Sequence, residues 1–272
     1  MTARPMPGDP TAIVEPGAEI GEDVEIGAYA IVEARVRIGR ATRLHAHAVV
    51  RGPTTLGKGN VVHPFAVLGG EPQAKRHHGG PSPTRIGDHN VVREHVTVHG
   101  GTEGRTTTIG SHNLLMVSAH VAHDVTIGAH CIVANAVQLA GHSTIGDWVT
   151  FGGLAGLAQF VRVGDSAFVA AGAMCERDVP PFVIVQGDRA RVRGLNIVGL
   201  RRRGIAEESI AALASAYRAL FASKDPRAAA LARVRLATSD PLVGMLIAAL
   251  EMRSKLERVD APDAADAYDE PI

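Results

Sequence analysis

Residues 121–145 read VAHDVTIGAHCIVANAVQLAGHSTI, and an aliphatic residue recurs in them at every sixth position. A small or aliphatic residue follows four places after each of these, with glycine or polar residues between. The same pattern fits twenty-five segments, and its aliphatic positions run from Val14 to Cys175. A six-residue period is typical of a parallel β-helix built from hexapeptide repeats. We therefore predict an all-β solenoid, and this repeat type is expected to wind left-handed, against the usual rule for parallel crossovers.

Each repeat should supply one short strand and one turn, so that three repeats close a triangular coil of eighteen residues. Twenty-five repeats give about eight coils. The aliphatic and the small positions should point inward and stack along the axis, because neighbouring strands lie only about 4.8 Å apart. Pairs such as Ile20-Gly21 and Ile127-Gly128 are expected to place flexible glycine at the corners.

The repeat ends at Val179-Pro180-Pro181, because proline cannot donate to a strand ladder. An irregular stretch, 182–199, should follow. Apolar residues then recur with a helical period from about Ala206, and further helices are expected near 226–237 and 240–258. We predict the β-helix over 11–198, a small C-terminal helical domain over 199–258 and a disordered acidic tail over 259–272.

Composition indicates a soluble intracellular protein. The formal net charge is zero, and no apolar run is long enough to span a membrane. The first ten residues lack the pattern of a secretory signal. Cys131 and Cys175 fall at inward positions and should be core thiols in a reducing compartment. We expect a cytoplasmic protein with no nucleic-acid partner and no integral membrane segment.

Two interruptions of the repeat are the first functional clue. Leu68 and Ile86 are eighteen residues apart where six would continue the pattern, and Val98 and Ile109 are five further apart than the repeat requires. Loops are therefore predicted near 69–85 and 100–108. Loops that leave a rigid scaffold often carry binding residues.

Residues eighteen apart should lie on neighbouring coils, and correcting for the two loops aligns one column along one edge. The column contains Gly69, His99, His123, Gly141-His142 and Gln159. Its histidines should point outward, and although a single outward histidine is usually solvated surface, several aligned beside a loop indicate a site. Asp124 follows His123 directly, and a carboxylate beside an imidazole can orient the ring and raise its basicity.

Six segments resemble the UDP-N-acetylglucosamine acyltransferases of lipid A biosynthesis. They are Ala119–Asp124, Leu139–His142, Gln159-Phe160, Asp178–Pro181, Gln186-Gly187 and Asn196–Gly204. The resemblance covers roughly residues 10–222. It implies transfer of an (R)-3-hydroxyacyl group from acyl carrier protein to the 3-hydroxyl of the sugar nucleotide. It also implies a homotrimer with sites between neighbouring solenoids, and no cofactor beyond the 4′-phosphopantetheine that the carrier protein brings.

This chemistry fits the aligned residues. A sugar hydroxyl is a poor nucleophile, so the transfer needs a base with a pKa near 7, and His123 fits that role with Asp124 as a helper. The backbone N–H of Gly141, one coil above, can donate to the tetrahedral transition state, and by resemblance it is the oxyanion donor. No serine or cysteine is placed to form an acyl-enzyme, which favours direct attack in a ternary complex.

The resemblance implies binding roles for a further set of residues: Gln73, Lys75, Arg76, His99, His120, His142, Gln159, Asn196, Arg202 and Arg203. The long loop carries the first three, and the last three match uridine and diphosphate contacts of the family. Arginines near residues 189–203 form a basic cluster that can steer an acidic carrier protein.

The chain departs from the family at five positions. Ala74, Arg76, Ala158 and Val198 stand where the family has Asp, Lys, His and an acidic residue, and Ala171 replaces a glycine at the floor of the acyl groove. We interpret Ala171 as an acyl-chain ruler that favours donors of roughly ten to twelve carbons, because a methyl group there narrows the groove.

The changed contacts leave other acceptors and donors open. One alternative is a related nucleotide-sugar acyltransferase that uses a 3-amino sugar or an acyl-coenzyme A donor. A non-catalytic scaffold would explain the lost contacts but not the retained His123 and Asp124. A zinc hydratase needs three converging histidine ligands, and that family's pair of histidines five residues apart is absent, so no metal site is predicted.

Overall fold

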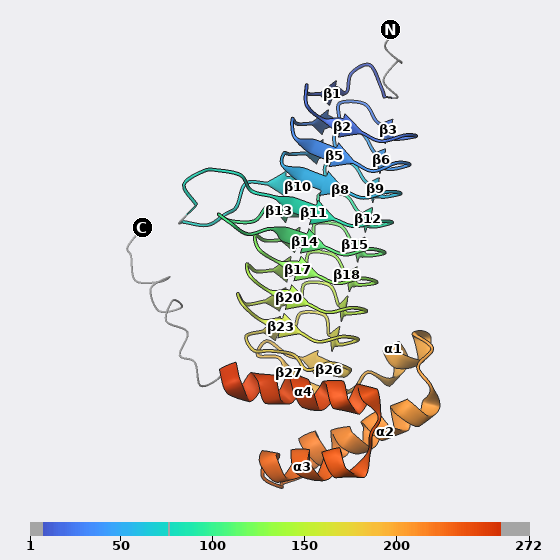
Figure 1. The fold of residues 1–272 in the computed structure, drawn as a ribbon, viewed down its shortest axis with the longest axis vertical. Coiled ribbons are helices and arrows are strands. Elements are labelled where there is room, and N and C mark those ends of the chain that lie inside the picture. The colour runs from blue at the N-terminus through green and yellow to red at the C-terminus, as the bar shows by residue number, and fades with distance from the viewer. Residues whose placement is uncertain (1–7, 76, 257–272) are drawn as a thin grey trace. The chain divides into compact units, whose positions relative to one another are not determined.

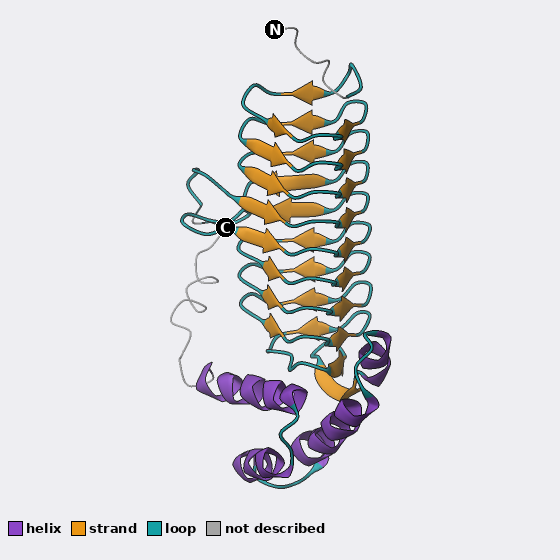
Figure 2. Cartoon of the chain, turned by 45° about the vertical axis from the view of Figure 1, so that its right-hand side comes forward, coloured by secondary structure: helices purple, strands orange, loops and turns teal. Residues whose placement is uncertain are grey.

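The computed structural model describes residues 8–75 and 77–256. Short strands wind through three sheets, and the coils follow one another along a single axis (Figures 1 and 2). We name each sheet by its number of strands. The nine-strand face contains β1 (Ile13–Val14), β4 (Ile31–Val32), β7 (Val49–Val50), β10 (Val67–Gly70), β13 (Thr97–His99), β16 (His120–Val121), β19 (Gln138–Leu139), β22 (Gly156–Leu157) and β25 (Met174–Cys175).

The other two faces complete the triangular coil. The eight-strand face contains β2 (Glu19–Ile20), β5 (Val36–Ile38), β8 (Thr54–Leu56), β11 (Thr84–Ile86), β14 (Thr107–Ile109), β17 (Thr126–Ile127), β20 (Thr144–Ile145) and β23 (Arg162–Val163). The ten-strand face contains β3 (Glu25–Ile26), β6 (Arg43–Leu44), β9 (Val61–Val62), β12 (Val91–Val92), β15 (Leu114–Leu115), β18 (Ile132–Val133), β21 (Thr150–Phe151), β24 (Phe168–Val169), β26 (Val183–Gln186) and β27 (Arg191–Leu195).

The strands pair in the register that the repeat predicts. Val121 pairs with Leu139 one coil on, which is eighteen residues away. The two insertions leave the aliphatic positions in register, since Val98 pairs with Leu68 on one side and with Val121 on the other. The parallel β-helix is therefore confirmed, and its left-handed winding stays a prediction.

The core consists of the two inward positions of each repeat. Aliphatic residues such as Val121, Leu139 and Leu157 are buried. Three buried asparagines occupy small positions on successive coils and form a ladder. Asn60 Oδ1 accepts hydrogen bonds from the backbone and side-chain nitrogens of Asn90 at 2.9 and 3.0 Å, and Asn90 Oδ1 accepts one from Asn113 N at 2.9 Å. These bonds satisfy polar groups that burial would otherwise leave costly.

Glycine was expected at the corners because of its flexibility, and that reason was wrong. The left-handed residue of each corner lies three places after the aliphatic position and is seldom glycine; Asp124 has φ 62° and His142 has φ 63°. The glycine directly after the aliphatic residue is needed for close packing between coils instead. A Cβ on Gly128 would lie 2.8 Å from the carbonyl carbon of Gly146, which no side chain tolerates.

The stretch 182–199 is more regular than the sequence indicated. β26 pairs in parallel with β24, and β27 returns antiparallel to β26, so the ten-strand face continues past the eight coils expected. Gly187 makes this hairpin possible with φ 107°. The two prolines before this stretch favour an irregular conformation, but the residues of β26 alternate between buried and more exposed positions as a strand does.

Contacts divide the chain into two units, Met1–Gly199 and Leu200–Ile272. α1 (Ile197–Arg202) spans the division. The second unit contains α2 (Glu207–Tyr217), the π-helical turn η1 (Arg218–Ala222), α3 (Arg227–Ala237) and α4 (Pro241–Leu256). The predicted acidic tail, 259–272, lies outside the described residues.

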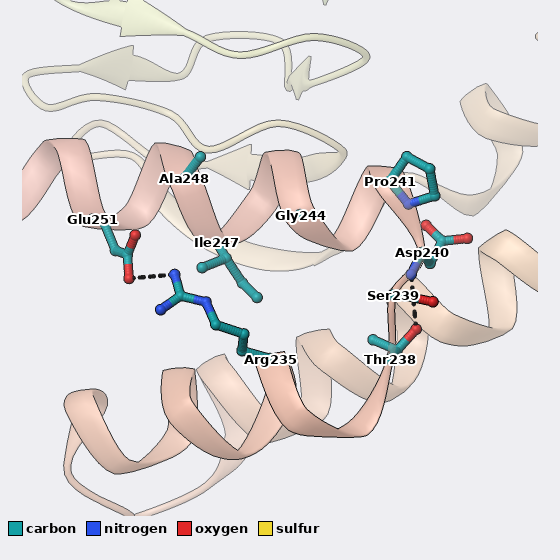
Figure 3. Close-up of a pocket in the computed structure, with 9 residues that line it drawn as sticks. All are labelled: Arg235, Thr238, Ser239, Asp240, Pro241, Gly244, Ile247, Ala248 and Glu251. Carbon is teal, nitrogen blue, oxygen red and sulfur yellow. Dashed lines mark hydrogen bonds and ion pairs between the residues drawn. The ribbon is translucent and has the colours of Figure 1, made fainter.

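Buried Leu213, Val243 and Leu246 contribute to the apolar core of the helical unit. Arg235 of α3 and Glu251 of α4 form an ion pair at 2.8 Å beside a shallow pocket (Figure 3). Asp240 caps α4 by accepting a hydrogen bond from Leu242 N at 2.9 Å. Among the helices of the described ranges, none combines the length and apolar character that a bilayer span requires.

Candidate active site

Both insertions leave the same edge of the solenoid, where the nine-strand face turns into the eight-strand face; we call it the loop edge (Figure 1). The long loop, residues 71–83, joins β10 to β11, and the short loop, residues 100–106, joins β13 to β14. Backbone hydrogen bonds tie the loops together: Gly100 N donates to Gly70 O at 2.8 Å, and Gly101 N donates to Pro83 O at 3.0 Å.

His123 and Asp124 meet on the loop edge, at the corner that follows β16. His123 Nδ1 lies 2.8 Å from Asp124 Oδ2, and their side chains are only 10 % and 3 % exposed. Burial alone would raise the pKa of Asp124, but hydrogen bonds from His123 and Thr102 outweigh it and hold that pKa below its usual range. An ionised carboxylate only accepts hydrogen bonds, so Nδ1 carries the proton and Nε2 keeps its lone pair.

The imidazole of His123 lies against the backbone of Gly141 on the next coil. A Cβ at residue 141 would be 2.7 Å from His123 Cε1 and 2.9 Å from Nε2, so only glycine fits there. The carbonyl of Gly141 accepts a hydrogen bond from Phe160 N at 3.1 Å, whereas its N–H donates none within the described residues. A free N–H therefore lies beside the basic nitrogen of His123.

His142 neighbours the same carboxylate. Its Nδ1 is 3.5 Å from Asp124 Oδ2 and 3.1 Å from a guanidinium nitrogen of Arg105 in the short loop. Arginine only donates, so Nδ1 accepts and Nε2 carries the proton. Burial lowers the pKa of His142, and the charge of Arg105 lowers it further although Asp124 opposes both. The ring also stacks on Phe160, with centroids 4.7 Å apart.

His120 and His99 form a second pair, one coil toward the N-terminus of the His123–His142 pair. Their rings meet edge to face with centroids 5.0 Å apart, and Thr97 Oγ1 lies 2.8 Å from His120 Nδ1. Burial, followed by the nearby His99 and His123, lowers the pKa of His120 to about 4. Burial also lowers the pKa of His99. Both rings are therefore neutral near pH 7 and offer uncharged hydrogen-bonding groups.

The predicted column differs from the structure in one register detail. Gly70, not Gly69, pairs with His99, because the strand bulges between Leu68 and Gly70 and Gly69 adopts φ 76°. Gln159 lies one coil above Gly141 and is exposed. Gln73 and Lys75 are exposed on the long loop, and Arg76 lies outside the described residues.

Asn196 has a local structural role. Its Nδ2 donates to Ser166 O at 2.9 Å, and its Oδ1 accepts from Gly199 N at 3.1 Å, so the buried side chain caps the start of α1. Arg202 is the last residue of α1 and Arg203 follows it, within the second unit. Nucleotide binding by these three residues stays a prediction.

Ala171 does not lie on the loop edge. It is exposed at the corner between the ten-strand and nine-strand faces, because the 48 residues from His123 to Ala171 are not a whole number of coils. The residues stacked above His123 on its own edge are Gly141 and Gln159 instead. An acyl chain that reaches both His123 and Ala171 of one chain would have to cross the nine-strand face.

Thr102 and Arg105 contact the site, but the sequence pattern does not identify them. The five extra residues of the short loop gave its position, yet nothing in its composition indicated which side chains turn inward. One ligand atom from each of His123, Asp124 and His142 lies within 4.8 Å of the others. The short bond between His123 and Asp124, and the cation of Arg105 beside His142, favour a hydrogen-bonded network over a metal site.

Comparisons with known proteins agree with this geometry. Residues 178–258 match the family model described as UDP N-acetylglucosamine O-acyltransferase, domain 2, and residues 106–141 match the bacterial transferase hexapeptide model. A relative from Burkholderia lata, named an acyl-(acyl-carrier-protein)–UDP-N-acetylglucosamine O-acyltransferase, is 46 % identical over 214 residues, covering 78 % of this chain and 82 % of the relative. A namesake from Xylella fastidiosa is 44 % identical, with 81 % and 85 % covered.

Solved structures give the same result. The UDP-N-acetylglucosamine O-acyltransferase of Moraxella catarrhalis superimposes with a TM-score of 0.87 at 38 % identity, covering 91 % of this chain and 97 % of that one. Since relatives at this level of identity match over most of their own length, the chain belongs to the family of UDP-N-acetylglucosamine O-acyltransferases.

Proposed function

We propose that this enzyme moves an (R)-3-hydroxyacyl group from acyl carrier protein to the 3-hydroxyl of UDP-N-acetylglucosamine, the first step of lipid A biosynthesis. Relatives that are 44–46 % identical are named for this donor and this acceptor. The substrates are the carrier protein, with its 4′-phosphopantetheine arm, and the sugar nucleotide. Because the carrier protein and the sugar nucleotide are both soluble molecules of the cell interior, we place the reaction in the cytoplasm.

In this mechanism His123 is the general base. The lone pair on Nε2 accepts the proton of the sugar hydroxyl as that oxygen attacks the thioester carbonyl. Asp124 holds Nδ1–H at 2.8 Å and stabilises the imidazolium that forms. When the tetrahedral intermediate collapses, the C–S bond breaks and the imidazolium returns the proton to the departing thiolate.

Gly141 supplies the oxyanion donor. Charge develops on the carbonyl oxygen during attack, and the N–H of Gly141 is free to donate to it. Direct attack is favoured over an acyl-enzyme, because burial raises the pKa of Cys131 to about 12 and that of Cys175 to about 11. Neither thiol is a thiolate near neutral pH. The neutral rings of His99, His120 and His142 then position the acceptor and the thioester.

We also propose that the enzyme works as a homotrimer. On a single chain the loop edge is open, with Gln159 and Phe160 exposed one coil above Gly141. A neighbouring copy would exclude water from this edge and bring its own residues, Ala171 among them, into reach of a donor bound at His123. Sedimentation should therefore give a trimer, and a monomer at micromolar concentration that retains activity would contradict the assembly.

The observation that carries the proposal is the His123–Asp124 pair beneath the free N–H of Gly141. It is tested by incubating the purified enzyme with 3-hydroxyacyl carrier protein and UDP-N-acetylglucosamine, and locating the acyl group by mass spectrometry and NMR. We expect an ester at O3 and one free carrier thiol per product.

Parallel reactions decide between acceptors and donors. One uses the 3-amino analogue of the sugar nucleotide, and another uses 3-hydroxyacyl-coenzyme A. A higher kcat/KM with the 3-amino sugar would make it the acceptor in place of UDP-N-acetylglucosamine. A higher kcat/KM with acyl-coenzyme A would make it the donor in place of acyl carrier protein. If no acyl group is transferred in any of these reactions, the proposal that the protein is an acyltransferase is contradicted.

A further inference from the structure

We propose that Thr102, in the short loop, is a positioning residue that orients Asp124 toward His123. This inference rests on the proposed function, because it concerns the base of that reaction. It gives a role to the smaller interruption of the hexapeptide pattern, whose purpose the repeat itself does not explain.

Thr102 binds both oxygens of the carboxylate. Its N–H donates to Asp124 Oδ1 at 2.9 Å, and its hydroxyl donates to Asp124 Oδ2 at 2.7 Å. Oδ2 is the same oxygen that faces His123 Nδ1 at 2.8 Å. Thr102 therefore holds both oxygens of the carboxylate and fixes its rotation about the Cβ–Cγ bond. In this orientation Oδ2 faces the imidazole of His123.

The loop itself is held in place on both sides. Gly101 N donates to Pro83 O at 3.0 Å, and Thr107 N donates to the same carbonyl at 3.2 Å. Within the loop, Arg105 N donates to Thr102 O at 2.9 Å. Asp124 is anchored independently, because its own N–H donates to Thr107 Oγ1 at 2.8 Å. The position of Thr102 thus follows from the backbone and not from Asp124 alone.

Loss of the hydroxyl would leave His123 as the one remaining side-chain donor to Asp124 Oδ2 among the described residues. His142 Nδ1, 3.5 Å from Oδ2, accepts from Arg105 and has no proton to donate to the carboxylate. With the hydroxyl present, Oδ2 accepts from Thr102 and His123, and the carboxylate is held facing His123. Without it, the carboxylate gains freedom to turn and loses a donor that lowers its pKa. The population of His123 with the proton on Nδ1 should then fall, and with it the supply of basic Nε2.

The test compares Thr102→Val, which removes the hydroxyl, with Thr102→Ser, which keeps it. Thr108→Val is the matched control, because Thr108 lies on β14 beside the loop and takes no part in the site. We expect kcat of Thr102→Val to fall about tenfold, the order expected from losing one hydrogen bond to a charged group. KM for both substrates should stay within twofold, and Thr102→Ser and Thr108→Val should keep nearly the wild-type kcat.

A second readout does not depend on activity. Nitrogen-15 NMR of the histidine side chains reports the tautomer of His123, whose signal is the one missing from His123→Ala. We expect the Nδ1–H tautomer to dominate in wild type and Thr102→Ser and to decline in Thr102→Val. If acyl transfer fails with every substrate, this measurement still tests the role of Thr102 separately from the proposed function.

Three results would overturn the inference. The first is a Thr102→Val enzyme with wild-type kcat and an unchanged His123 tautomer. The second is an equal loss of kcat in Thr102→Val and Thr102→Ser, and the third is a rise in KM alone; either of these would mean that Thr102 only shapes the loop. Thermal melting of each variant checks that the β-helix is intact.

Discussion

Histidines line all three edges of the β-helix, and two of these lines make the clearest comparison. On the edge between the eight-strand and ten-strand faces, His89, His112, His130 and Trp148 occupy the left-handed corner position of successive coils. We call it the stacked edge, because these rings lie face to face; those of His112 and His130 are 3° from parallel and 4.9 Å apart. On the loop edge, His123 and His142 meet edge to face at 83° and share a buried carboxylate.

The difference shows what makes a row of histidines into a site. The repeat places rings one coil apart on either edge, and rings about 5 Å apart stack well without further partners. Only the loop edge has insertions, and the short one brings Thr102 to the carboxylate of Asp124 and Arg105 to the imidazole of His142. Polar partners from outside the repeat, and not the column itself, therefore distinguish the site from the stack. Each prediction below compares the two edges or tests how far the site extends.

Apart from removal of the base itself, the largest difference is expected between the acidic residues beside the corners, Asp124 and Asp147. Asp124→Asn should lower kcat on the order of 10²-fold, because an amide that donates to Nδ1 forces the proton onto Nε2 and removes the base. Asp147 is the matched control, since among the described residues its carboxylate accepts one hydrogen bond, from Ala129 N at 2.7 Å on the stacked edge. Steady-state kinetics should show Asp147→Asn within twofold of wild type. Equal effects of the two changes would erase the distinction between the edges.

A smaller loss is expected from Gly141→Ala. The new methyl group would lie 2.7 Å from His123 Cε1, so the ring or the coil must shift and the N–H of residue 141 with it. We expect kcat to fall about tenfold or more, within the range for a damaged oxyanion donor. Gly153→Ala is the control, because its Cβ would meet only Asn135 O at an ordinary 3.5 Å. Full activity of Gly141→Ala would remove that N–H from the mechanism.

Ala171 tests whether the site extends beyond the loop edge. If its methyl group stops the acyl chain, wild type should prefer donors of roughly ten to twelve carbons, and Ala171→Gly should shift the preference toward fourteen by several-fold. Each buried methylene is worth only about 0.8 kcal/mol, so a steric stop discriminates more sharply than affinity. The check is kcat/KM for ten-, twelve- and fourteen-carbon donors. An unchanged ranking in the glycine variant would exclude Ala171 as the ruler.

The smallest effect concerns stability and pH. His120 takes up a proton near its ordinary pKa of 6.5 when unfolded but near 4 when folded. Between these pH values the unfolded chain therefore binds more protons than the folded one. The stability that neutral His120 contributes to the fold is present above pH 6.5 and is lost as the pH falls toward 4. His120→Gln should lose fewer degrees of melting temperature than wild type between pH 7 and pH 5. An equal or larger loss in the variant would contradict the lowered pKa.

Much of the fold was accessible from the sequence because the repeat carries its own register. The six-residue period set the strands, and the two breaks in it set the loops, so Val98 and Val121 were placed on adjacent coils correctly. The hairpin of β26 and β27 was missed because it follows the last repeat and is held by pairing with β24 rather than by a period.

The site was accessible only in part. His123, Asp124 and Gly141 follow from the coil arithmetic, and the structure brings them together. Thr102 does not, because its contact depends on the path of a short irregular loop that no period describes. Asn196 shows a different limit of the sequence. Its match to the family indicates a ligand contact, but in the structure its side chain caps α1. A sequence match cannot distinguish a ligand-binding role from a helix-capping role.

The most direct test of the account measures acyl transfer by His123→Ala and His112→Ala in one assay. Both substitutions remove an imidazole from a row of rings, and both leave the inward positions of the coil untouched. If the loop edge holds the general base, kcat of His123→Ala falls on the order of 10²–10⁴-fold with an unchanged fold, while His112→Ala stays within twofold of wild type. A folded His123→Ala enzyme that keeps a tenth of wild-type activity would contradict the central claim.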